Sequence, residues 1–116
     1  MANADTALTE SEIRNRLGAL PGWTHEDGAI RRVYQTDGWR GSMLVANAIG
    51  FICEAADHHA DLTVSWPRVG VALSTHSAGG ITAKDFEVAV LIEHQIRWKP
   101  PEGSSLSGPA KPFVKE

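Results

Sequence analysis

With 116 residues, of which 42% are hydrophobic and 22% charged, the chain is long enough for one folded domain of ordinary globular composition. Its net charge of −3 and pI near 5.9 supply no basic surface for nucleic acid, and no apolar run reaches the roughly 18 residues of a membrane span. The start, Met1 to Asp5, lacks the basic and apolar segments of a signal peptide, and the single cysteine, Cys53, allows no internal disulfide, so we expect a cytoplasmic protein.

The first third of the chain is predicted to form a helix and a hairpin. Residues 1–8 are a polar lead-in that we expect to be a flexible N-terminus. Thr9 and Glu12 make a capping-box pattern, and the apolar spacing after them predicts a helix over residues 10–19. Two segments rich in β-formers, residues 23–26 and 30–36, flank Asp27-Gly28, a dipeptide typical of tight hairpin turns.

The rest of the chain repeats this order. A helical pattern covers residues 39–58, and alternating apolar residues in 61–66 and 69–75 predict a second hairpin with its turn at Pro67-Arg68. Thr82 is the predicted cap of a third helix, with Asp85 three residues later. This helix is expected to run to about Trp98, and residues 99–116, rich in Pro, Gly, Ser and Lys, are expected to form a flexible C-terminal tail.

The order α-β-β-α-β-β-α predicts an α+β fold. Each strand pair is joined too tightly for a crossover helix, so each pair must be antiparallel. The simplest arrangement is a four-stranded antiparallel sheet with helices packed on one face. The third helix is apolar on more than one side, which predicts that it also contacts a neighbouring subunit.

Three of the five histidines fall in one short region: His58 and His59 at the predicted end of the second helix, and His76 at the predicted end of a strand. The ordinary pKa of histidine lies close to neutrality, which suits acid–base catalysis. Glu54 precedes His58 by four residues and is expected to hold its ring on the helix face. Asp85, in the first turn of the third helix, is placed to close the group.

Each of these residues also has an ordinary interpretation when taken alone. A His-His pair can be a solvated helix end, His76 a surface residue, and Asp85 an acid favoured by the helix dipole. A zinc site made of the three histidines is a further alternative, although the spacing lacks the usual i,i+4 pair. His25 and His94 have no acid or base partner nearby in sequence and are taken as structural.

The combination of these residues is more specific than any one of them, and it resembles the signature of the pterin-4a-carbinolamine dehydratases. In that family an acidic residue precedes His-His-Pro, an aromatic residue follows, and a Thr-His pair and an aspartate complete the site. The resemblance is gapless from Glu54 to Asp85, and the predicted element order extends it from about Leu8 to Trp98. The matching residues are Glu54, Asp57, His58, His59, Trp66, Ser74, Thr75, His76 and Asp85. Ala60 replaces the usual proline and Leu62 an aromatic of some members, which alters local packing without removing a proton-transfer group.

The resemblance implies a hydro-lyase domain over residues 9–98. It would convert a 4a-hydroxytetrahydropterin into quinonoid dihydropterin and water during tetrahydrobiopterin recycling, without a metal or organic cofactor. The implied active-site histidines are His58, His59 and His76, with the acid and base roles undivided. The substrate-binding or orienting residues implied with them are Glu54, Asp57, Ser74, Thr75 and Asp85.

The resemblance also bears on partners and on rival functions. It implies a homodimer or homotetramer, here through the third helix, and an aromatic amino acid hydroxylase as pathway partner. Net charge and the lack of a long apolar run argue against nucleic acid and membrane as partners. Some relatives are transcriptional coactivators or Rubisco assembly factors, so a non-catalytic binding module of the same fold is the first alternative. A metal-dependent hydrolase with the three histidines as ligands is the second.

Overall fold

The computed structural model describes residues 6–116, so the first five residues of the predicted N-terminal lead-in lie outside the described residues. The order of elements is that predicted, with one short 3₁₀ turn added after the fourth strand. The elements are α1 (Glu10–Leu17), β1 (Thr24–Glu26), β2 (Ala29–Gln35), α2 (Trp39–Ala56), β3 (Asp61–Ser65), β4 (Arg68–Leu73), η1 (His76–Ala78) and α3 (Ala83–Ile96). Among the helices of this range, none is long and apolar enough to cross a membrane.

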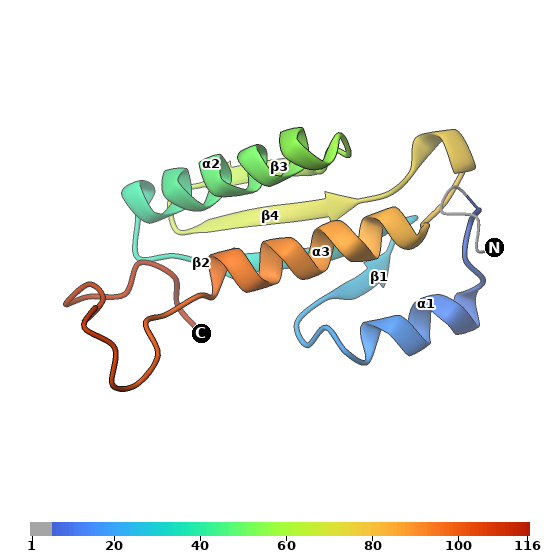
Figure 1. Ribbon diagram of the computed structural model, residues 1–116. Coiled ribbons are helices and arrows are strands. Elements are labelled where there is room, and N and C mark those ends of the chain that lie inside the picture. The colour runs from blue at the N-terminus through green and yellow to red at the C-terminus, as the bar shows by residue number, and fades with distance from the viewer. Residues whose placement is uncertain (1–5) are drawn as a thin grey trace.

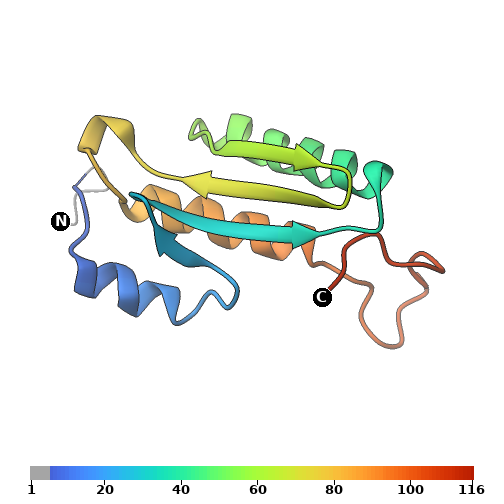
Figure 2. The same cartoon turned by 180° about the vertical axis from the view of Figure 1, so that it is seen from behind.

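The four strands form one antiparallel sheet in the order β1-β2-β4-β3. The first hairpin turns at Asp27 and Gly28, both with positive φ (48° and 74°), which is the conformation that the Asp-Gly signal predicts. The second hairpin turns at Trp66 and Pro67, one residue earlier than predicted. Figures 1 and 2 show α2 and α3 side by side across one face of this sheet, with α1 beside β1. The predicted α+β class and antiparallel sheet are therefore confirmed.

The core lies between the sheet and the two long helices. In β4 the alternate residues Val69, Val71 and Leu73 are buried, whereas Gly70 and Ala72 on the other side are not. From the helices, Ile49 and Ile92 are completely buried against them. Burying a side chain of this size stabilises the fold by about 1.5–3 kcal/mol, so this layer fixes where α2 and α3 sit.

The helix starts are as predicted, two of them with their capping boxes, whereas each helix ends about two residues earlier than predicted, at Leu17, Ala56 and Ile96. Thr9 with Glu12 and Thr82 with Asp85 both form complete capping boxes, at α1 and α3. The second helix, in contrast, ends at Ala56 rather than at His58, because Asp57 turns into the left-handed conformation with φ 54°. Aspartate is among the few non-glycine residues that adopt this conformation readily. The two histidines after it therefore leave the helix.

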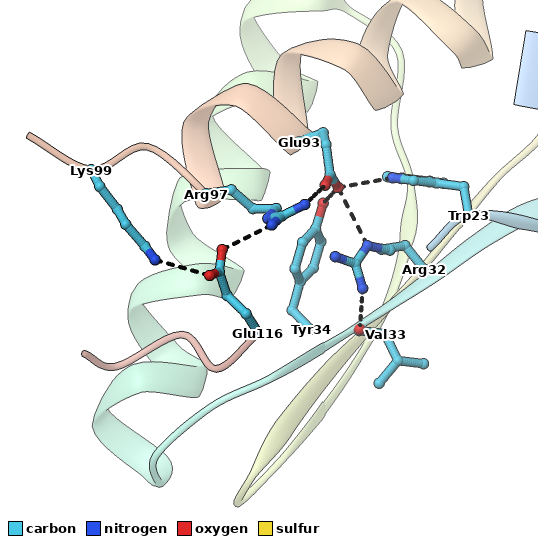
Figure 3. Close-up of polar contacts among 8 residues, drawn as sticks. All are labelled: Trp23, Arg32, Val33, Tyr34, Glu93, Arg97, Lys99 and Glu116. Atoms are coloured by element: carbon cyan, nitrogen blue, oxygen red, sulfur yellow. Dashed lines mark hydrogen bonds and ion pairs between the residues drawn. The ribbon is translucent and has the colours of Figure 1, made fainter. Parts of the chain in front are cut away.

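A polar cluster around Glu93 ties α3 to the strands (Figure 3). Glu93 Oε1 accepts hydrogen bonds from the Tyr34 hydroxyl (2.6 Å), the Trp23 indole N–H (3.0 Å) and Arg32 Nε (3.3 Å). Burial, the largest single effect, opposes ionisation, but these donors together with Arg97 hold the pKa of Glu93 below its ordinary value. Burial and the adjacent carboxylate raise the pKa of Tyr34. The cluster holds α3 against the sheet, at the end of α3 that is remote from Asp85.

The C-terminal residues differ from the loose extension expected from their composition. Lys115 N donates to the Gln35 carbonyl (2.8 Å), so the chain end lies beside the end of β2. The Glu116 carboxylate meets both Arg97 (2.8 Å) and Lys99 (3.0 Å), as Figure 3 shows, and these cations lower its pKa to about 2. Between this tail and the end of α3 lies a cavity of about 580 Å³.

Candidate active site

A buried carboxylate, Asp85, organises one end of the molecule. Its Oδ1 lies 2.6 Å from His58 Nε2, and its Oδ2 accepts from the Thr75 hydroxyl (2.8 Å) and the Thr82 backbone N–H (2.9 Å). Asp85 is completely buried, whereas the His58 side chain keeps 14% of its surface exposed. These three partners, His58, Thr75 and Thr82, follow α2, follow β4 and precede α3, respectively. The packing of the three elements therefore brings His58 and Asp85 together. Asp85 thus fixes the ring of His58, and a small part of this side chain stays accessible.

His59 has a different acid. Its Nε2 lies 2.8 Å from Glu54 Oε1, and both side chains are exposed, by 56% and 83%. The expectation that Glu54 would hold His58 is therefore wrong in this structure. It assumed that the helix continued through both histidines; because α2 ends at Ala56, His58 turns inward to α3 and His59 comes within reach of Glu54.

His76 lies on the loop that follows β4. It is exposed at the start of η1 and follows directly after Thr75, the buried residue that donates to Asp85. The loop is closed by an antiparallel bridge in which Thr75 N donates to the Gly80 carbonyl (2.8 Å). The segments bearing the three histidines are thus linked through one carboxylate, from parts of the chain that are distant in sequence.

The remaining predicted site residues lie at different depths. Asp57 is exposed and its backbone ends α2, Ser74 is half-buried just after β4, and Thr75 is buried against Asp85. Trp66, which forms part of the sequence signature, lies at the β3–β4 turn, at the other end of these strands from the histidines. Thr75 is therefore built to orient Asp85, and Ser74 lies closer to the surface.

One residue of this arrangement, Thr82, was predicted only as a helix cap. Thr82 is completely buried, and its hydroxyl lies 2.8 Å from that of Thr75. The capping-box pattern predicted its role at the helix start, but no pattern in the sequence indicates that its hydroxyl hydrogen-bonds to the hydroxyl of Thr75, seven residues earlier. Within residues 6–116, no three or more His, Cys, Asp or Glu side chains are grouped so that they could hold a metal ion.

Fold and site together define a small α+β domain in which two carboxylates, Asp85 and Glu54, hydrogen-bond to two neighbouring imidazoles. The chain belongs to the pterin 4 alpha carbinolamine dehydratase family, a family of hydro-lyases, whose model matches residues 6–95. The resemblance stated from sequence is thereby confirmed.

Individual relatives and a solved structure agree with this membership. A protein of Roseiflexus castenholzii with the provisional name pterin-4-alpha-carbinolamine dehydratase is 40% identical over 77% of this chain and 96% of its own. One of the same provisional name from Aquifex aeolicus is 39% identical over 78% of this chain and 91% of its own. The crystal structure of a transcriptional coactivator/pterin dehydratase from Brucella melitensis matches with a TM-score of 0.73 at 32% identity, covering 78% of this chain and 98% of that one.

Proposed function

We propose that this chain dehydrates 4a-hydroxytetrahydropterin to quinonoid dihydropterin at His58, His59 and His76. The observation that supports this most is the buried Asp85, which holds His58 at 2.6 Å and is bonded to the residue preceding His76. A structural role alone gives no reason to pair two neighbouring imidazoles with carboxylates and to tie one of these carboxylates to the residue that precedes a third, exposed histidine. Membership in a dehydratase family supplies the substrate class.

The reaction needs one acid and one base. The acid protonates the hydroxyl on carbon 4a, the C–O bond breaks with help from the N5 lone pair, and water leaves. The base accepts the N5 proton, so the enzyme returns to its starting charge. Because Nε2 of both His58 and His59 faces a carboxylate, their Nδ1 atoms are the ones left for substrate. Asp57 and Ser74 complete the proposal as residues that contact or orient the pterin.

His59→Ala and His76→Ala are each expected to lower turnover of a 4a-hydroxytetrahydropterin by at least about tenfold, because each removes a proton-transfer group. Both side chains are exposed, so thermal unfolding should change little. Stopped-flow absorbance, with the spontaneous dehydration rate subtracted, measures the effect. His94→Ala, an exposed histidine near the far end of α3, is the matched control and should keep wild-type turnover. Full activity in both site variants would refute the assignment of these histidines.

A non-catalytic binding module of the same fold is the second candidate, and the name of the Brucella protein, which pairs coactivator with dehydratase, favours considering it. Turnover no faster than the spontaneous rate would support that candidate. Elemental analysis addresses the hydrolase alternative, which requires stoichiometric zinc whose removal abolishes activity. In the dehydratase proposal the protein acts without metal or organic cofactor, in the cytoplasm, on the product of an aromatic amino acid hydroxylase during tetrahydrobiopterin recycling.

We also propose that the chain forms a homodimer or homotetramer. Large apolar side chains are exposed along α3, as predicted, and also along the neighbouring α2; they are Trp39, Met43, Leu44, Phe51, Val90 and Leu91. Exposed apolar surface of this kind is typical of subunit contacts. Light scattering at micromolar concentration is expected to give a mass of at least twice the 12.5 kDa chain, and Phe51→Glu, at a residue 76% exposed, to reduce it. A wild-type monomer would contradict the proposal.

A further inference from the structure

Behind the His58–Asp85 pair lies a chain of buried hydroxyl groups. Thr82 is completely buried and Thr75 is 4% exposed, so both residues are shielded from solvent. The two hydroxyl oxygens lie 2.8 Å apart, and Thr75 Oγ1 lies 2.8 Å from Asp85 Oδ2. Buried hydrogen bonds in series polarise one another, so the members of such a chain act together.

The chemistry of the groups fixes the direction of this chain. A threonine hydroxyl has one proton to donate. Thr75 gives its proton to the Asp85 carboxylate, so the contact between the two hydroxyls must use the proton of Thr82. Thr82 Oγ1 in turn accepts from the Lys84 backbone N–H (3.2 Å). The chain therefore runs from the backbone of α3 through both threonines to Oδ2 of Asp85.

We propose that Thr82 is a positioning residue for the dehydration site, acting through Thr75 and Asp85 to fix the orientation and tautomer of His58. This inference rests on the proposed function. With Oδ2 occupied by Thr75 and by the Thr82 N–H, the carboxylate presents Oδ1 to the imidazole. His58 Nε2 then carries the ring proton, and Nδ1 is left as the acceptor that faces substrate.

Thr82→Val tests the proposal, because valine has the same shape and no hydroxyl. It is expected to lower kcat by about three- to tenfold while KM stays within about twofold, since an orienting residue acts on the reacting state. In long-range ¹H–¹⁵N spectra of Thr82→Val, the His58 ring should no longer give the signal pattern of the Nε2-protonated tautomer that is expected for the wild type. Thr82→Ser keeps the hydroxyl and should restore both readouts. Unchanged kcat and unchanged ring signals in Thr82→Val would overturn the proposal.

Thr9→Val is the matched control, because Thr9 makes the same type of capping box at α1. It should lower stability without changing kcat or the His58 signals; an equal loss of kcat would show that cap removal alone explains the effect and overturn the proposal.

If Thr82→Val does not fold, Thr75→Val breaks the same row of hydrogen bonds with the cap intact. Wild-type kcat and ring signals in Thr75→Val would also overturn the proposal. If the wild-type protein shows no turnover, only the dehydratase assignment is refuted, because the His58 ring signals report on the row of hydrogen-bonded hydroxyls independently of activity.

Discussion

Asp85→Asn is expected to lower turnover by about a hundredfold or more, the size of a lost acid–base contribution. The carboxylate offers two acceptors, Oδ1 to His58 and Oδ2 to Thr75 and the Thr82 N–H. An amide offers one acceptor and one donor. If its oxygen stays with the threonines, its NH₂ faces His58 Nε2 and forces the ring proton onto Nδ1. The nitrogen left for substrate then carries a proton where the wild type has a lone pair.

The activity loss can be separated from a loss of fold. Asp85→Ala also removes the capping-box acid and leaves buried donors without partners, so it should lower the free energy of unfolding by about 3 kcal/mol. Asp85→Asn preserves shape and is expected to stay folded in urea titrations at the assay temperature. Glu87→Gln, which removes an exposed carboxylate from the same helix, is the control and should keep both turnover and stability. Wild-type turnover in Asp85→Asn would show that the tautomer of His58 is irrelevant to the reaction.

The pairings among the predicted site residues could not be obtained from the sequence. Sequence spacing placed Glu54 on the helix face of His58, and that spacing holds only while the helix continues. The helix ends at Ala56 because Asp57 takes a left-handed conformation, which an aspartate permits but does not require. The pairing of His58 with Asp85 then depends on how α2 and α3 pack, a contact across 27 residues that local patterns do not encode.

The fold shows the same division between local and distant information. Asp27-Gly28 specified its hairpin, because few residues adopt two positive φ angles in succession. The central pairing of β2 with β4 was not predicted, since either hairpin could have turned its other edge inward. The tail was expected to be loose from its composition, yet Phe113 O receives a hydrogen bond from Asp37 N (3.1 Å) and a Cβ on Gly41 would lie 2.8 Å from that same carbonyl. That close approach gives Gly41 a role that sequence alone did not reveal.

Glu93→Ala is expected to lower the free energy of unfolding by about 2–4 kcal/mol, because it leaves the Tyr34 hydroxyl and the Trp23 indole N–H without their acceptor in a largely buried place. It also leaves Arg32 without its carboxylate. Urea unfolding followed by tryptophan fluorescence measures the change. Glu102→Gln, at an exposed position in the tail, should stay within about 0.5 kcal/mol of the wild type. A Glu93→Ala protein as stable as that control would show that the cluster does not lock α3 to the sheet.

The same carboxylate should make stability depend on pH in a defined direction. The pKa of Glu93 is lowered from the ordinary 4.5 in the folded protein, so its contribution is present above that value and is lost as pH falls through the folded pKa. Glu93→Gln lacks the charge at every pH and is therefore expected to be less stable than the wild type at pH 7. The difference in unfolding free energy between wild type and Glu93→Gln is therefore expected to shrink as the pH is lowered below about 4.5 in urea titrations. If this difference stayed constant from pH 7 to pH 3, the negative charge of Glu93 would not contribute to stability. The contribution of the cluster would then come from its packing and not from the ionised carboxylate.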